Sequence, residues 1–111
     1  MTSKPYLGEF EQVVLLVIVG QGNDVASVAI SRALEEDAGR AVSRGALYTT
    51  LDRLRKKGFL DWRVEPGDIA RSGLPRRHFT VTEQGMGMLR ASRDVLMGLW
   101  KEAEEGLERA R

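Results

Sequence analysis

The sequence predicts a mainly helical domain with one small β-hairpin. Hydrophobic spacing is helical up to Gly58, changes to a period of two over residues 60–65, and is helical again in a long C-terminal segment. A length of 111 residues suits one domain. The chain has no cysteine, which excludes disulfides, thiolate catalysis and cysteine zinc fingers. The longest apolar run, Val13–Val19, is far shorter than the roughly 20 residues that cross a bilayer, so we expect a cytoplasmic protein without a membrane partner.

Two helices are predicted in the N-terminal part. Residues 9–19 become almost wholly apolar after the first turn, and the segment Gly20–Asn23 closes the run, which indicates a largely buried helix. A second helix starts at Asp24 or Ser27, either of which can cap it, and ends before Gly39.

The third helix has the clearest signals at both ends. Ser43 is a good N-cap, and Gly58 supplies a left-handed terminator. Leu47, Leu51 and Leu54 recur at helical spacing and form one buried stripe. At 100° per residue, the opposite face carries Gly45, Thr49, Asp52 and Lys56.

A hairpin follows the third helix. Leu60, Trp62 and Val64 alternate with polar residues, so this strand should have one wet face and Trp62 should lie in the core. Residues 66–75 form a turn-rich tip, and residues 78–81 a returning strand. A helix-turn-helix followed by a hairpin is a winged helix-turn-helix. We assign it to residues 1–82 and a C-terminal dimerisation helix to residues 83–111, the two forming one compact unit.

The last helix, capped by Thr82 and running to about Glu108, carries more apolar surface than a lone exposed helix should. We therefore expect a second copy to cover it in a homodimer. In this dimer, the Trp100 side chains of the two copies either pack against each other or line a cleft, together with Leu96, in which a small aromatic effector stacks. The predicted dimerisation seam is Leu89, Leu96, Trp100, Ala103 and Leu107, continuing to Ala110.

Positive charge is concentrated in the middle of the chain. The net charge is +1, but residues 40–79 carry a balance of +6, against −4 for residues 1–39 and −1 for residues 80–111. A one-sided basic surface favours a polyanionic partner, and chance clustering of charges on solvated loops is the alternative.

Three segments resemble PadR-like transcriptional regulators. Residues 45–60, GALYTTLDRLRKKGFL, are similar to that family's recognition helix and strand entry. Residues 76–85, RRHFTVTEQG, are similar to its wing strand and the start of its last helix, and residues 7–11, LGEFE, to the opening of its first helix. The resemblance implies a homodimer through the C-terminal helix, acting as a repressor that binds an inverted-repeat operator in double-stranded DNA.

The predicted DNA contacts lie on the third helix and the hairpin. A helix enters the major groove when one stripe is buried and the other side is free, and flanking arginines reach bases or phosphates. Wing arginines follow the backbone or enter the minor groove, although charge also protects edge strands from unwanted pairing. Asp52 should orient Lys56 or Arg53. The predicted contacts are Ser43, Arg44, Gly45, Tyr48, Thr49, Arg53, Lys56, Arg71, Arg76, Arg77 and His78.

We predict that the protein is not an enzyme and needs no cofactor or metal ion. His78, the only histidine, has no partner at metal-ligand spacing and no nucleophile beside it, and there is no Gly-rich phosphate loop. The leading function is a dimeric, sequence-specific DNA-binding repressor, with release by a small effector as a further expectation. The alternative is a winged-helix module that docks a protein or RNA without operator specificity.

Overall fold

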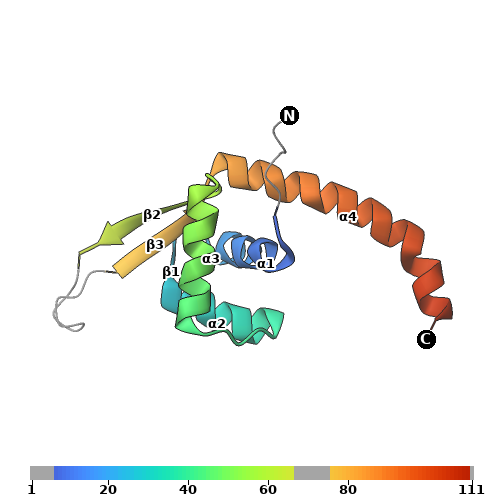
Figure 1. Cartoon of the computed structure of the whole chain (residues 1–111), viewed down its shortest axis with the longest axis horizontal. Coiled ribbons are helices and arrows are strands. Elements are labelled where there is room, and N and C mark those ends of the chain that lie inside the picture. The colour runs from blue at the N-terminus through green and yellow to red at the C-terminus, as the bar shows by residue number, and fades with distance from the viewer. Residues whose placement is uncertain (1–6, 67–75, 111) are drawn as a thin grey trace.

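The computed structural model describes residues 7–66 and 76–110. Figure 1 shows the first three helices and the sheet in one body, from which the β2–β3 hairpin and α4 extend toward opposite ends. The mainly helical fold with a small hairpin is confirmed, while residues 67–75 of the predicted hairpin tip lie outside the described part. The elements are α1 (Glu9–Gly20), β1 (Val25–Ala26), α2 (Ser27–Ala38), α3 (Arg44–Lys56), β2 (Leu60–Glu65), β3 (Arg76–Val81) and α4 (Glu83–Arg109).

The core lies where α1, α3 and the sheet meet. Val14, Leu15 and Ile18 of α1 are fully buried, which confirms the buried first helix. They form one apolar cluster with the leucine stripe of α3 and with Phe79 and Val81 of β3. Burial of this apolar surface is the main force that holds α3 and the hairpin on one body.

The start of α2 differs from the prediction. Ala26 is the N-cap residue and supplies no side-chain cap; Asp24 bonds to Arg63 instead, and Ser27 is already the first helical residue. The physical reason is β1, a two-residue strand that we did not predict from the sequence. It pairs antiparallel with β3, which makes the sheet order β1-β3-β2 and keeps the chain extended through Ala26. Gly39 ends α2 with a φ of 65°, as predicted.

Asn23 leads the chain onto the sheet. Its φ of 59° is left-handed, a conformation that Asn tolerates better than most residues. Its side-chain amide forms the two hydrogen bonds that a neighbouring strand would form with Val81. Oδ1 accepts from the Val81 amide at 2.7 Å, and Nδ2 donates to the Val81 carbonyl at 3.3 Å. This contact joins two segments 58 positions apart and helps to anchor β1.

The hairpin returns to the body through a tight junction of Gly58, Thr82 and Gly85. Gly58 has the predicted left-handed backbone, with a φ of 85°. The Thr82 hydroxyl donates to the Gly58 carbonyl at 2.7 Å and accepts from the Gly85 amide at 3.1 Å, so Thr82 caps α4 as predicted. Gly85 lies so close to Phe59 that a Cβ there would be 2.4 Å from the Phe59 carbonyl oxygen.

The outer end of β2 is less buried than expected, and α4 leaves most of its predicted apolar seam exposed. In β2, Leu60 is buried, Trp62 is only half-buried and Val64 is exposed, because the strand runs out beyond the core. In α4, Gly85 and Leu89 pack on the body, whereas Leu96 and Trp100 are exposed. In the part of the chain described here, no helix has both the length and the apolar character needed to cross a membrane.

Candidate nucleic-acid interface

Helix α3 is buried on one side and exposed on the other, as predicted. The Ser43 hydroxyl accepts a hydrogen bond from the Ala46 amide at 3.1 Å and so caps the helix. The stripe Leu47, Leu51 and Leu54 is buried. On the opposite face, the side of the helix away from the core, four residues are exposed: Gly45, Thr49, Asp52 and Lys56.

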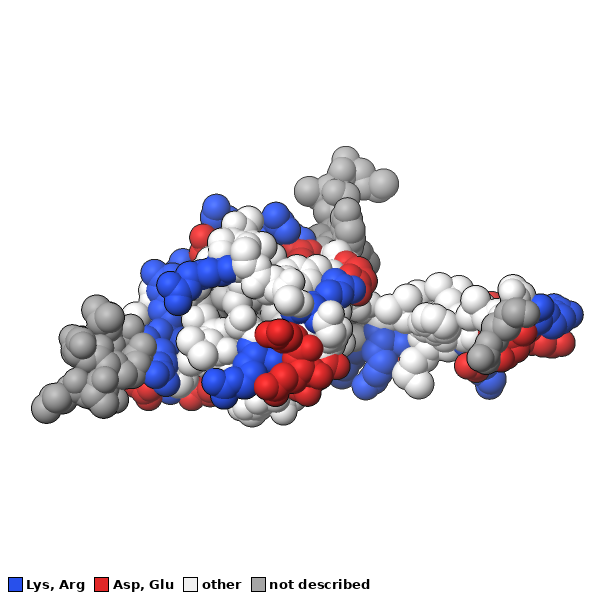
Figure 2. All heavy atoms as spheres, turned by 90° about the horizontal axis from the view of Figure 1, so that it is seen from below, with Lys and Arg blue, Asp and Glu red and all other residues white. Residues whose placement is uncertain are grey.

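Arginines from α3 and from the hairpin converge beside this helix. Arg44 and Tyr48 of α3 and Arg76 and Arg77 of β3 line one hollow of about 350 Å³, together with the start of α2. Figure 2 shows Lys and Arg side chains gathered over the body next to the hairpin. The structure therefore brings four of the predicted contact residues to one place, although they come from segments some 30 positions apart.

The first turn of α2 adds unpaired backbone donors to this hollow. The N-cap Ala26 has no side chain that can accept from the first amides of the helix. Such amides and the positive end of the helix dipole together favour an anion. The Tyr48 hydroxyl donates to Ser27 Oγ at 2.9 Å, which fixes α3 against the start of α2. The hollow is thus lined by three arginines and a helix N-terminus.

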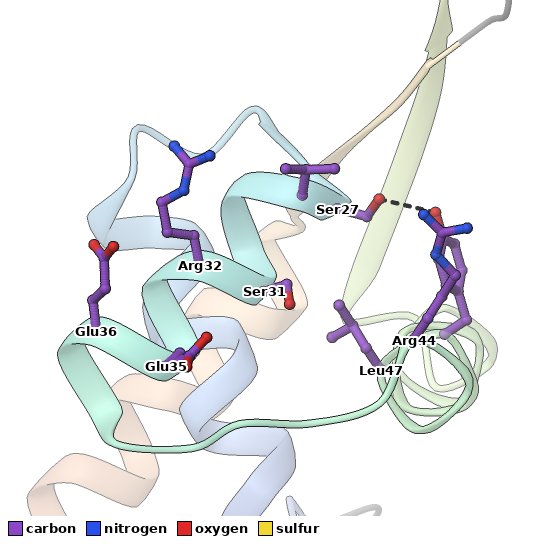
Figure 3. A pocket seen from close by; sticks show the side chains of 9 residues that line it. Ser27, Ser31, Arg32, Glu35, Glu36, Arg44 and Leu47 are labelled. Carbon is purple, nitrogen blue, oxygen red and sulfur yellow. Dashed lines mark hydrogen bonds between the residues drawn. The ribbon is translucent and has the colours of Figure 1, made fainter.

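A second hollow, of about 420 Å³, lies between α2 and α3 (Figure 3). Arg44 and Leu47 face it from α3, and Ser31, Arg32 and Glu35 line it from α2. Acidic side chains on the α2 side set it apart from the arginine-rich hollow. Only the latter has the charge that suits a phosphate.

The outer face of the sheet carries charges that are already paired. Arg63 donates to both carboxylate oxygens of Asp24, at 3.2 and 2.7 Å, and lies 3.6 Å from Glu65. These hydrogen bonds hold the pKa of Asp24 below its ordinary value of 3.8. Arg63 is therefore occupied within the chain, although it belongs to the basic middle segment.

His78 belongs to the same paired face. Its Nε2 lies 2.9 Å from Glu65 Oε2 and its Nδ1 3.6 Å from Asp24 Oδ1, although neither contact has hydrogen-bond geometry. Its side chain is only 15% exposed. The structure does not bring His78 to the arginine-rich hollow, and DNA contact by His78 stays a prediction.

The remaining predicted contacts are spread around α3. Arg53 and Lys56 are exposed, and Arg53 lies on the flank toward α1, near enough to Glu11 to help lower the pKa of that carboxyl group. Within the described residues, no ion pair joins Asp52 to Lys56 or Arg53, so the structure does not show the expected orienting contact. Arg71 lies outside the described residues.

One contact of the interface was missed from the sequence. The guanidinium groups of Arg55 and Arg77 both lie over the ring of Trp62, at 5.0 and 4.4 Å from its centroid. The only signal in the sequence for this contact is the alternation of side chains along β2 and β3, which places Trp62 and Arg77 on the same face of the hairpin. For the described residues, no cluster of three or more His, Cys, Asp or Glu side chains could hold a metal ion.

The fold is a winged helix-turn-helix in which α3 borders a cluster of arginines. This combination is typical of DNA-binding proteins. Residues 14–91 match the PadR-like family of transcriptional regulators, and the chain belongs to this family. Its members are transcriptional regulators. No curated protein matches the sequence.

Solved structures of the same fold come from several bacteria. A PadR family transcription regulator from hypervirulent Clostridium difficile R20291 is 17% identical, with a TM-score of 0.75 over 90% of this chain and 99% of that chain. A PadR family regulator from Eggerthella lenta DSM 2243 is 24% identical, with a TM-score of 0.70 over 90% and 87%. Bacillus subtilis PadR in complex with operator DNA is 18% identical, with a TM-score of 0.63 over 74% of this chain and 46% of that chain.

Proposed function

We propose that the protein is a dimeric, sequence-specific DNA-binding repressor. The observation that carries the proposal is the hollow in which Arg44, Arg76 and Arg77 converge beside the first turn of α2. Three arginines that line one hollow beside a helix N-terminus suit a DNA phosphate, because guanidinium groups and helix amides both donate hydrogen bonds to its oxygens. The operator complex of the Bacillus subtilis neighbour supports the same use of this fold.

In this proposal, α3 lies in the major groove while the hairpin follows the backbone. Gly45 and Thr49 are exposed and small, which lets the helix approach the base edges, and Lys56 lies on the same face. Arg44, Arg76 and Arg77 bind phosphates and fix the register of the helix. Ser43, Tyr48 and Arg53 border this face, and contacts by Arg71 and His78 remain predictions.

Two copies joined through α4 would present two recognition helices. The exposed apolar side chains Leu96, Leu99, Trp100 and Leu107 support this proposal, since isolated helices in water rarely leave such a seam uncovered. Leu89 is already nearly buried against the body, so the seam available to a partner begins at Leu96. Twofold symmetry then requires an inverted-repeat operator with half-sites about one helical turn, roughly 34 Å, apart.

Release by an effector belongs to the same proposal. A hollow of about 400 Å³ lies between α1 and α4 and is lined by apolar side chains that include Leu16, Leu96 and Trp100. A small aromatic molecule that stacks on Trp100 there would change the angle between α4 and the body, and with it the spacing of the two recognition helices.

The test selects duplexes from a random pool and measures their affinity at several salt concentrations. We expect the selected duplexes to contain an inverted repeat. R44A and R76A should each weaken binding and make the slope of log affinity against log salt shallower by about 0.9 for each phosphate that is no longer neutralised. The control is R109A, which removes the same charge at the far end of α4 and should leave the slope unchanged.

Failure to enrich any duplex sequence would overturn the proposal. It would also be overturned if R109A weakened binding as much as R44A, because binding would then follow net charge and not the hollow. The alternative, a module that docks a protein or RNA, predicts that no duplex sequence is enriched and that a partner binds in the absence of DNA.

A further inference from the structure

Trp62 connects the recognition helix to the wing through two arginines. It lies in β2, is half-buried and packs against the edge of the apolar core. The guanidinium carbon of Arg55, in the last turns of α3, is 5.0 Å from the centroid of its ring. That of Arg77, in β3, is 4.4 Å away.

The strand register explains how Arg77 reaches the ring. Trp62 pairs with Phe79, and Val64 pairs with Arg77, so all four side chains lie on one face of the hairpin. Phe79 is buried, whereas Val64 and Arg77 lie beyond the core. A side chain of the size of Trp62 at this point can therefore touch the core with one part and the arginines with another.

A guanidinium group that stacks on an aromatic ring keeps its hydrogen-bond donors. The stacking uses the flat face of the group, and the five N–H donors point outward in its plane. Arg63, in the same hairpin, shows the opposite arrangement, since its donors are taken by the carboxylate of Asp24. Within the described residues neither Arg55 nor Arg77 forms an ion pair with a carboxylate.

We propose that Trp62 is a positioning residue for DNA binding, which orients Arg77 of the wing and Arg55 of the recognition helix toward the phosphates. The inference rests on the proposed function and deepens it. The ring restricts two long, exposed side chains before DNA arrives, so less conformational entropy is lost when they bind phosphates. It also sets the distance between the wing contact and the helix contact, which determines the backbone shape that the protein prefers.

A double-mutant cycle distinguishes positioning from packing. Operator affinity is measured for the wild type, W62L, R77A and the double variant. We expect W62L to lower affinity by about three- to tenfold, and W62F, which keeps a weaker aromatic ring, to restore part of the loss. R77A should cost much less in the W62L background than in the wild type, because the arginine is already misplaced there.

R44A is the matched control for the cycle. Arg44 lines the same hollow but does not stack on Trp62, so the effects of R44A and W62L should multiply. If the effects of R77A and W62L multiply as well, Trp62 only fills space and the inference is overturned.

Fluorescence tests the stack itself without DNA. In a W100F background Trp62 is the only tryptophan, and R77A should change its emission, whereas R76A should not. Unchanged emission in R77A would overturn the inference while leaving the proposed function intact. If the wild type enriches no duplex at all, the proposed function and this inference fall together.

Discussion

At position 85, close packing leaves room only for glycine. The segment Thr82–Gly85 opens α4 directly under the strand that leads into the wing, and the Thr82 hydroxyl ties both backbones together. A Cβ at Gly85 would lie 2.4 Å from the Phe59 carbonyl oxygen and 2.7 Å from Val81 Cγ1. Neither neighbour can move without disturbing the core, since Phe59 and Val81 are both buried.

We therefore expect G85A to lower the free energy of unfolding by about 1–3 kcal/mol, the usual cost of overpacking. Gly87, two residues on in the same helix, is the control, because a Cβ at that position would have no neighbouring atom within 4 Å. G87A should be neutral or stabilising by up to about 1 kcal/mol, since Ala is the better helix former. Urea unfolding of the two variants checks this, and equal stabilities would contradict the close approach at Gly85.

At the scale of elements, an ion pair joins α1 to the end of α3. Lys57 Nζ lies 2.8 and 2.9 Å from the two carboxylate oxygens of Glu11, whose side chain is only 7% exposed. The Gly8 amide also donates to Glu11. Burial raises the pKa of Glu11, but the hydrogen bonds from Lys57 and Gly8 and the positive charges of Lys57 and Arg53 together outweigh it, so the pKa lies below its ordinary value of 4.5.

A lowered carboxyl pKa stabilises the fold above the unfolded value, and this contribution is lost as pH falls through the folded value. E11Q should reduce the free energy of unfolding at pH 7 by about 1–3 kcal/mol. The difference between the wild type and E11Q should then shrink as pH falls below about 4.5. Denaturant titrations from pH 3 to 7 measure it, with exposed Glu36 as the control site (E36Q). A difference independent of pH would show that the charge on Glu11 contributes nothing.

At the scale of the whole molecule, α4 extends away from the body and leaves an apolar seam uncovered. Figure 1 shows its C-terminal half clear of every other element, and Trp100 is 60% exposed. Figure 2 shows a largely uncharged surface on this half before its charged tip. A second copy of the chain is the covering that the proposed repressor requires.

The variant L96E/W100E should shift the molar mass in sedimentation equilibrium from twice 12.4 kDa to 12.4 kDa, because two buried carboxylates at a dimer seam are unfavourable. Operator affinity should fall with it, since each monomer then binds a half-site alone. K101E adds negative charge on the other side of α4 and should remain dimeric. A wild type that sediments as a monomer would overturn the dimer proposal.

Local chemistry made much of this architecture predictable. The leucine stripe of α3, the caps Ser43 and Thr82, and the terminators Gly39 and Gly58 depend on residues within about one turn of each other, so periodicity and capping rules identify them. The order of the four helices and of β2 and β3, and with it the winged helix-turn-helix, followed from these signals, whereas β1 did not.

Contacts between distant segments needed the folded chain. β1 exists because residues 25 and 26 meet β3, and Asp24 binds Arg63, 39 positions away, instead of capping α2. Trp62 lies against Arg55 and Arg77 because α3 and β3 approach it from two directions. Such pairs depend on how whole elements pack and register, which no short stretch of sequence encodes. Residue patterns therefore identified the helix that we propose to face DNA, and packing determined that Arg63 is paired with Asp24 whereas Arg55 and Arg77 stack on Trp62.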